Sequence, residues 1–259
     1  NMGCAIMRGA FQGGFLKPYE TMVYDVSEQQ LAALTAAYPV NVAENNIQIA
    51  RECEFIILAI KPIYMRGVLE EIQKYCYNKK IISIAAGWSM AMLTEILGRD
   101  NSAQVLRVMP NTPLAVGEGM SLISSLCTCT DEEFDFAKSV FAAAGKVAVV
   151  EDHVYTPANG ISGCGPAFVY AFIEAMADGG VRYGVPRALA YELAAQTLVG
   201  AAKMVLETGE HPGRLKDAVC SPGGTTIEGM YALEKGGMRA AVMDAVGATV
   251  EKTMRMAKK

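Results

Sequence analysis

Short apolar runs alternate with helical patterns over the first 150 residues, and this alternation constrains the fold more than any other feature of the chain. The runs at 55–60 and 81–85 are almost continuously apolar, as expected of strands buried on both faces of a sheet. The alternation predicts a parallel, doubly wound α/β sheet. Further strands are predicted at 21–25, 105–109, 121–126 and 146–150, with helices at 27–37, 64–75, 89–97 and 131–144.

Strand-like runs stop after residue 151, and helical patterns cover 167–178, 186–207, 226–234 and 238–256. We therefore predict a sheet domain at 1–151 and an all-helical domain at 152–259. The helix at 186–207 is apolar around much of its cylinder, and such a helix needs partners on several sides. Because a single domain of about 110 residues buries only some of this apolar surface, we expect a homodimer or higher homo-oligomer built through the helical domain.

The start of the chain departs from the doubly wound pattern. In such proteins a first strand and a glycine-rich loop precede the opening helix, whereas this chain begins at Asn1, where that loop should be ending. The missing strand would occupy the middle of the sheet, and its absence would leave two edges unpaired. We therefore expect the first strand to lie outside the printed sequence.

The composition of the chain limits the kinds of partner that it is expected to bind. The net charge is −4 and no basic run indicates a nucleic-acid surface. No apolar run approaches the roughly 18 residues of a membrane helix, so no membrane contact is expected. The seven cysteines are scattered and only two histidines are present, which argues against a metal site and favours free thiols in the cytoplasm.

The segment 215–227 combines small, hydroxylated and glycyl residues directly before a helical stretch. Helix N-termini carry unpaired N–H groups and bind carboxylates or phosphates. Gly223 and Gly224 let a ligand approach the backbone closely, and neighbouring hydroxyls add hydrogen bonds. The alternative is a tight turn followed by an ordinary capped helix.

The same segment, L-K-D-A-V-C-S-P-G-G-T-T-I, resembles the signature of the pyrroline-5-carboxylate reductases. Other motifs of that family follow in its order: A-I-K-P at 59–62, A-A-G at 85–87, V-M-P-N-T-P at 108–113 and S-G-C-G-P-A at 162–167. The matches span nearly the whole chain. The resemblance implies a Rossmann-like domain for NADPH or NADH, a helical dimerisation domain, and reduction of 1-pyrroline-5-carboxylate to L-proline, the last step of proline biosynthesis.

The resemblance also implies the substrate-binding residues. It assigns the substrate carboxylate to Ser221 and to the N–H groups around Gly224, Thr225 and Thr226. Thr226 is expected nearest the imine nitrogen, as a hydrogen-bond partner or proton donor, and is the candidate catalytic residue. The alternative is that Thr226 only caps the helix.

Candidate coenzyme-binding residues come from the strand ends and from the family motifs. Asp25 ends the second strand of the expected sheet, where an acidic side chain favours a free ribose 2′-hydroxyl and hence NADH. Lys61 could face a phosphate of the coenzyme; the alternative is that it is only a solvated residue at the end of a strand. The full set comprises Asn1, Met2, Asp25, Asn46, Ala59, Lys61, Ala86, Gly87 and Asn111.

Two other functions compete with the reduction of 1-pyrroline-5-carboxylate. One is a related imine reductase with another substrate, because Thr156, Asn159 and Cys164 depart from the usual family residues. Another is a catalytically silent dinucleotide-binding scaffold, although a scaffold would not require the hydroxyls and glycines of 221–226. Hydroxyacid oxidation is disfavoured, because Phe168 and Val169 stand where those enzymes place a lysine base.

Overall fold

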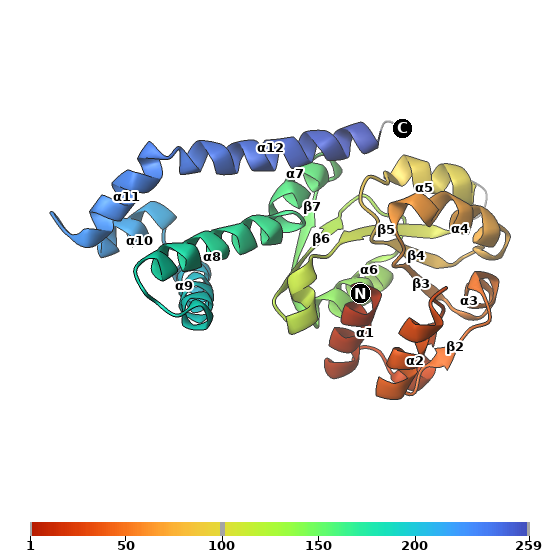
Figure 1. Cartoon of the computed structure of the whole chain (residues 1–259). Helices are drawn as coiled ribbons and strands as arrows, with labels where there is room; N and C mark the ends of the chain where they lie inside the picture. The colour runs from red at the N-terminus through yellow and green to blue at the C-terminus, as the bar shows by residue number, and fades with distance from the viewer. Residues whose placement is uncertain (1, 99–101, 258–259) are drawn as a thin grey trace. The chain divides into compact units, whose positions relative to one another are not determined.

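The computed structural model of the protein describes residues 2–98 and 102–257. The chain forms two compact units: the described residues up to Cys164 together with those from Thr249 onward, and Gly165–Ala248 (Figure 1). We call them the sheet unit and the helical unit. The sequence-based division at residue 151 would instead place the helix that follows the last strand with the helical unit.

A five-stranded sheet forms the framework of the sheet unit, in the order β3 (Phe55–Leu58), β4 (Lys80–Ser83), β5 (Gln104–Met109), β6 (Gly119–Ser124) and β7 (Gly145–Val150). The expectation of an all-parallel sheet is wrong at one pair, because β5 and β6 run antiparallel. Only the turn η5 (Thr112–Val116) joins them, and a parallel connection needs a crossover of a dozen or more residues. The sheet is therefore mixed.

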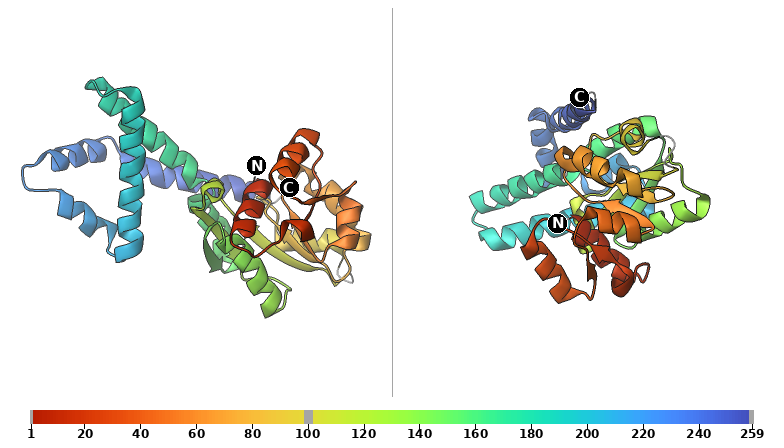
Figure 2. Two further views of the ribbon diagram at one scale, coloured as in Figure 1. Left: turned by 90° about the horizontal axis from the view of Figure 1, so that it is seen from below. Right: turned by 90° about the vertical axis from the view of Figure 1, so that its right-hand side faces the viewer.

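Helices cover both faces of this sheet (Figures 1 and 2). On one face, α3 (Asn46–Glu52), α4 (Met65–Ile72) and α5 (Met90–Leu97) bury a core that includes Leu69 and Leu93. On the other, α1 (Met2–Gln12) and α6 (Asp131–Ala142) enclose Ile6, Leu106 and Phe141. Neighbouring Ile81 and Ile82 of β4 belong to opposite cores, as expected of a buried strand.

A second, two-stranded sheet pairs β1 (Met22–Val23) with β2 (Asn41–Val42) in parallel. The helix α2 (Glu28–Ala37) connects them, and the Ser27 side chain accepts a hydrogen bond from Gln30 N at its N-terminus. Among the residues that the structure describes, β1 pairs only with β2 and β3 only with β4. The expected doubly wound sheet is thus divided between β1 and β3.

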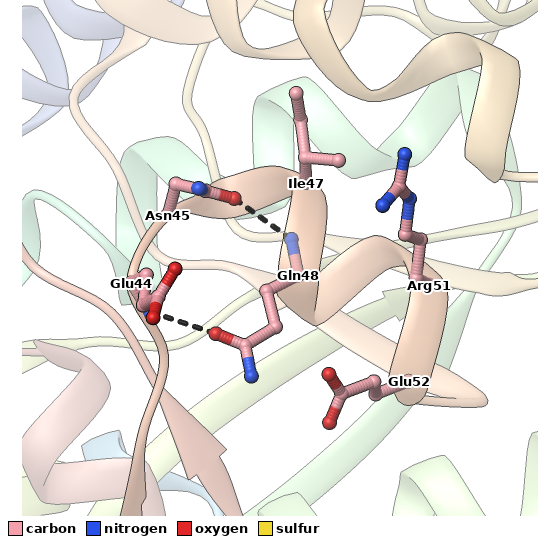
Figure 3. Close-up of a pocket in the computed structure, with 6 residues that line it drawn as sticks. All are labelled: Glu44, Asn45, Ile47, Gln48, Arg51 and Glu52. Carbon is pink, nitrogen blue, oxygen red and sulfur yellow. Dashed lines mark hydrogen bonds between the residues drawn. The ribbon is translucent and has the colours of Figure 1, made fainter.

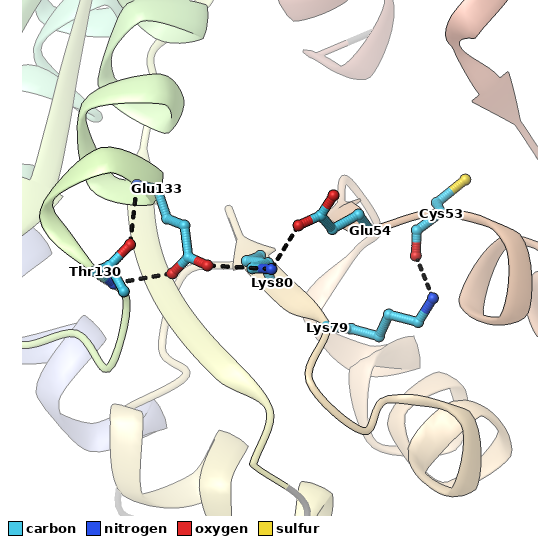
Figure 4. Close-up of polar contacts among 6 residues, drawn as sticks. All are labelled: Cys53, Glu54, Lys79, Lys80, Thr130 and Glu133. Carbon is cyan, nitrogen blue, oxygen red and sulfur yellow. Dashed lines mark hydrogen bonds and ion pairs between the residues drawn. The ribbon is translucent and has the colours of Figure 1, made fainter.

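Two adjacent lysines at the N-terminal end of β4 contact neighbouring elements of the sheet unit (Figure 4). Lys80 Nζ lies 2.6 Å from Glu54 Oε1 and 3.1 Å from Glu133 Oε1. Glu133 also forms the capping box of α6 with Thr130. Lys79 Nζ donates to Cys53 O at 2.7 Å, which ties the end of α3 to β4. These contacts hold α3 and α6 to the strands that they cover.

The helical unit comprises α8 (Gly165–Arg182), α9 (Arg187–Thr208), α10 (Pro212–Val219), α11 (Thr225–Lys235) and most of α12 (Met238–Met256). Its buried apolar residues are small, namely Ala177, Ala190 and Ala194. Large apolar side chains lie outside, including Leu206 (63% exposed) and Met243 (73%). The unit therefore has little core of its own.

One helical stretch of the described chain, Asp152–Arg182, is long and apolar enough to cross a membrane by length and composition, and an 18-residue window within it has a mean hydropathy of 1.2. It includes α7 (Asp152–Ser162) and α8. Counting continuous apolar runs missed it, because polar residues such as Glu174 interrupt the run. The expectation of no membrane contact rested on continuous apolar runs and stays a prediction.

Candidate active site

The carboxyl ends of β3, β4 and β5 share one edge of the sheet, because these strands are parallel. The N-terminal end of α1, where Met2 lies, meets that edge: a Cβ added to Gly3 would come 3.2 Å from Ala59 Cβ, just beyond β3. Further along α1, a Cβ at Gly9 would overlap Ala144, so glycine permits the close packing of α1 on the sheet unit. Asn1 lies outside the described residues.

Two turns follow β3 and β4 at this edge. Lys61 is exposed and its carbonyl oxygen accepts a hydrogen bond from Tyr64 N at 2.9 Å. After β4, Ala86 packs on the sheet and Gly87 adopts φ +78°, a conformation that favours glycine. Trp88 Nε1 donates to Pro62 O at 3.1 Å and so links the two turns. The structure thereby brings Ala59, Lys61, Ala86 and Gly87 to one edge.

The residues predicted for the ribose side lie on the first sheet and on α3. Asp25 Oδ1 accepts a hydrogen bond from Ser27 N at 2.9 Å, which fixes the carboxylate beside β1. Asn46 Nδ2 donates to Glu71 Oε2 at 2.8 Å. An open hollow of about 460 Å³ lies nearby on α3, but its lining does not include Asn46 (Figure 3). It is lined by Glu44, Asn45, Ile47, Gln48, Arg51 and Glu52.

Asn111 is committed to the framework rather than free toward a ligand. Its Nδ2 donates to Ser162 O at 2.9 Å, and its Oδ1 accepts from Met120 N at 2.9 Å. The side chain is buried, so both halves of its amide are satisfied internally. Asn111 therefore ties the turn after β5 to β6 and to the end of α7.

A cavity of about 100 Å³ lies between the turn after β4, strand β5, helix α7 and the last turns of α12. On its wall, Arg107 Nη1 lies 2.7 Å from Asp152 Oδ1, and the guanidinium carbon stands 4.2 Å from the centre of the Tyr155 ring. Burial raises the pKa of the Tyr155 hydroxyl well above its ordinary value, so the ring stays neutral. Asn159 lines the same cavity.

Sequence reasoning did not find this cavity. The available signal was Arg107, a charged residue in the middle of the apolar run 105–109. A buried arginine requires an anionic partner, and the first acidic residues after the last strand are Glu151 and Asp152. Asp152 is that partner, with Ser124 Oγ 3.3 Å from the same carboxylate oxygen.

The predicted substrate loop lies in the helical unit, between α10 and α11. Gly223 has φ +66°, and Gly224 N donates to Ser221 O at 3.0 Å. A Cβ at Gly224 would overlap the Ser221 hydroxyl, so a larger residue there would displace that side chain. Gly224 is the N-cap of α11 and has no side-chain capping hydrogen bond. The hydroxyls of Thr225 and Thr226 thus do not cap α11, whose first turn is exposed.

The chemistry of these groups is limited. Cys164 and Cys220 are half-buried free thiols, and the described residues contain no cluster of three or more His, Cys, Asp or Glu side chains that could hold a metal. The uncapped end of α11 can bind a carboxylate, and the strand edge beside α1 can hold a phosphate-bearing coenzyme. The arrangement suits orientation of a reduced coenzyme and an anionic substrate.

Comparisons with known proteins agree with the motifs. Residues 152–256 match the model of pyrroline-5-carboxylate reductase dimerisation, and residues 1–87 match that of NADP oxidoreductase coenzyme F420-dependent. The chain is 44% identical over 260 residues to the pyrroline-5-carboxylate reductase of Escherichia coli (strain K12), covering 100% of this chain and 96% of that protein. It is 42% identical to the enzyme of that name from Methanosarcina acetivorans, covering 100% and 95%.

Solved structures extend the match to the fold. The Plasmodium falciparum pyrroline carboxylate reductase, solved with NADP bound, superimposes with a TM-score of 0.90 at 34% identity, covering 99% of this chain and 94% of that one. The Streptococcus pyogenes 1-pyrroline-5-carboxylate reductase gives 0.87 at 28% identity, covering 98% and 95%. An imine reductase from Streptomyces aurantiacus, at 15% identity and a TM-score of 0.54, shares the fold alone.

Proposed function

The chain belongs to the pyrroline-5-carboxylate reductase family, and we propose that it reduces 1-pyrroline-5-carboxylate to L-proline with NADPH or NADH through the residues described above. The observation that carries this proposal is the full-length match, 44% identical over 260 residues, to a reductase of that name. The loop 221–226 supports it, because its glycines and uncapped helix end provide what an anionic substrate needs.

The strand edge fits the coenzyme. Gly3 and Gly9 leave room for α1 to pack closely, so the N–H groups of its first turn lie beside Ala59, where they can bind phosphate. Gly87 provides an open turn after β4. The bound coenzyme supplies the hydride for the C=N carbon. In this proposal Met2, Ala59, Lys61, Ala86 and Gly87 hold it in place, with Asn1 preceding them.

The loop before α11 fits the substrate. The N–H groups of Thr225 and Thr226 are offered to the carboxylate, with the Ser221 hydroxyl beside them. The Thr226 hydroxyl hydrogen-bonds the imine nitrogen and orients it for hydride transfer. Since threonine is a poor acid, the proton that reaches the nitrogen comes from solvent, and the product is the secondary amine of proline.

Coenzyme preference is assigned to Asp25. Its carboxylate is fixed by Ser27 N and would accept a hydrogen bond from a ribose 2′-hydroxyl, whereas it would repel a 2′-phosphate. NADH is therefore the proposed preference, although the Plasmodium relative was solved with NADP. The ratio of kcat/KM for the two coenzymes measures it, and a parent enzyme that works better with NADPH would contradict this role of Asp25.

A homodimer or higher homo-oligomer is proposed for the helical unit. Its large exposed apolar side chains lie within the segment that matches the dimerisation model, so a partner subunit would cover the apolar stretch 152–182 as well. We infer a cytoplasmic location without membrane or nucleic-acid contact, which the seven free cysteines and the net charge of −4 support.

The second candidate is an imine reductase for another substrate, which the departures at Thr156, Asn159 and Cys164 favour. Oxidation of NADH and NADPH by the full chain should be followed with three imines. These are 1-pyrroline-5-carboxylate, the carboxylate-free 1-pyrroline and the six-membered 1-piperideine-2-carboxylate. Our proposal expects the highest kcat/KM with the first, and a higher value with either of the others would favour the second candidate.

A further inference from the structure

Trp88 is the only tryptophan of the chain and follows directly after Gly87. Its side chain belongs to the core that includes Met65 and Leu93, and the residue is 8% exposed. A buried indole N–H needs a hydrogen-bond acceptor, because leaving it unpaired costs free energy. Nε1 finds its acceptor outside its own turn, at Pro62 O, 3.1 Å away. The indole therefore reaches from the turn after β4 to the turn after β3.

The acceptor belongs to the turn that carries Lys61. Pro62 opens the 3₁₀ helix η2 (Pro62–Tyr64), and its carbonyl oxygen also accepts a hydrogen bond from Met65 N at the end of that helix. A carbonyl oxygen has two lone pairs, so these two donors satisfy Pro62 O completely. One donor is local and shapes the turn, whereas the Trp88 indole ties the turn to the next strand of the sheet.

The turn after β4 has no side chain at its centre. Gly87 adopts φ +78°, and a Cβ added there would lie 3.4 Å from Met256 Cβ, so the end of α12 lies close to this turn. Ser89 follows as the N-cap of α5, where its hydroxyl accepts a hydrogen bond from Met92 N at 3.2 Å. Between the glycine and the helix cap, Trp88 is the large side chain that anchors the backbone of this turn.

The two turns lie at the edge of the sheet where the coenzyme is proposed to bind, with Lys61 on one and Gly87 on the other. A ligand that contacts both turns is bound more tightly when their spacing is already fixed, because less conformational freedom is lost on binding. A tertiary hydrogen bond that joins the turns in the free protein provides this preorganisation.

We propose that Trp88 is a positioning residue for the coenzyme, whose indole N–H holds the turn of Lys61 and the turn of Gly87 at the spacing that the coenzyme requires. The role needs no contact between Trp88 and the coenzyme. It rests on the proposed function, since Lys61 and Gly87 are coenzyme-binding residues only under that proposal. The alternative is an ordinary core residue, whose hydrogen bond stabilises the fold and leaves coenzyme affinity unchanged.

The test removes the N–H and keeps the shape of the ring. Because the chain has one tryptophan, replacement of this amino acid by benzothienylalanine changes position 88 alone, and sulfur takes the place of the indole N–H. Titration calorimetry on the full chain should show NADH and NADPH bound about 5- to 10-fold more weakly than by the parent. Protein that carries 5-fluorotryptophan, which keeps the N–H, should bind both coenzymes as the parent does.

Two variants complete the experiment. Trp88→Phe keeps an aromatic ring without the N–H, and it should repeat the loss of coenzyme affinity. Thr128→Val is the matched control, because it removes another hydrogen bond of the sheet unit, donated by Val105 N to Thr128 Oγ at 3.0 Å. Val105 lies near the amino end of β5, away from the carboxyl edge, so this variant should lose stability and keep its coenzyme affinity.

Unchanged coenzyme affinity in the benzothienylalanine protein, together with a lower free energy of unfolding, would make Trp88 an ordinary core residue and overturn the proposal. An equal loss of affinity in Thr128→Val would also overturn it, since affinity would then follow general stability. Calorimetry needs no imine. Coenzyme binding that depends on the N–H, in a protein without activity on 1-pyrroline-5-carboxylate, would therefore sustain this proposal while refuting the proposed function.

Discussion

The two compact units of this chain differ in the apolar side chains that they bury. The sheet unit encloses large side chains such as Phe141, Leu69 and Ile6 between its strands and helices. The helical unit buries only alanines and leaves Leu206 and Met243 on its surface. The sheet unit thus has the core of an independent domain, whereas the helical unit leaves a large apolar surface uncovered, which supports the proposed homo-oligomer.

The difference extends to the two candidate binding regions. At the strand edge, glycines, paired turns and internal hydrogen bonds already fix the shape that would meet the coenzyme. The loop before α11 is exposed, and the N–H groups at the start of α11 have no side-chain cap and can bind an anion. The proposed coenzyme region is therefore part of a folded core, whereas the proposed substrate loop belongs to the unit with the uncovered apolar surface.

Placing charged side chains on the apolar surface of the helical unit should have the largest effect on assembly and on activity. In the double variant Leu193→Glu with Leu206→Glu, four buried carboxylates would enter a homodimer, at a cost of several kcal/mol. We expect a monomer with little reductase activity. Sedimentation velocity at micromolar concentration measures the assembly. Tyr77→Glu, 62% exposed on the sheet unit, is the matched control and should leave it unchanged.

A monomeric parent with native secondary structure would break the comparison outright. So would a charged double variant that assembles as the parent does.

Removal of a core side chain from the sheet unit should cost about 3–5 kcal/mol, regardless of protein concentration. Phe141→Ala removes a fully buried ring and leaves a cavity between α6 and the sheet. Tyr231→Ala removes a ring that is 66% exposed in one chain, so its cost should depend on association. Thermal unfolding across a 100-fold range of concentration separates the two. Equal concentration dependence of both variants would contradict the independence of the sheet unit.

Thr226→Ala should lower kcat about 10- to 100-fold, since one positioned hydrogen bond in a water-excluded site contributes about 1–3 kcal/mol. Ser221→Ala should act mainly on KM, because carboxylate binding is weakened before and during reaction alike. Thr225→Ala is the matched control and should be mild, since its backbone N–H is retained. Steady-state kinetics decides, and an unchanged kcat in Thr226→Ala would reduce this threonine to a structural residue of α11.

The smallest effect concerns Lys80, whose pKa is raised by its hydrogen bond to Glu54. A raised lysine pKa stabilises the fold fully below the unfolded value, near 10.4, and the contribution is lost as pH rises through the folded pKa. Relative to Lys80→Arg, which stays charged, the parent should therefore lose stability above about pH 10. Urea unfolding at pH 8 and pH 11 measures the difference. Lys216→Arg, at an exposed pair, should change less.

Sequence patterns predicted the long elements well. The helix starts at Ser27 and Ser89 are confirmed, because side-chain caps are local signals. The short elements β2, α3 and α10 were missed, since two to eight residues carry too little periodicity. The reversal of β6 was also missed, although the short link between residues 110 and 118 excludes a crossover.

The candidate sites were also predicted only in part from the sequence. Family motifs predicted residues that the structure gathers at the strand edge, such as Ala59 and Gly87. They could not reveal that Asn111 is used internally, nor that Arg107, Asp152 and Asn159 surround one cavity. Those facts depend on side chains that meet only after α7 packs on the sheet. The site roles themselves stay predictions until they are tested.

The most direct test of the account follows the hydride itself. The full chain should be incubated with 1-pyrroline-5-carboxylate and NADH carrying deuterium at both C4 positions of the nicotinamide, and the product analysed by mass spectrometry. The account predicts proline that carries one deuterium at C5, the former imine carbon, in amounts equal to the coenzyme oxidised. Coenzyme oxidation without labelled proline, or no oxidation while the assembled protein binds NADH, would contradict it.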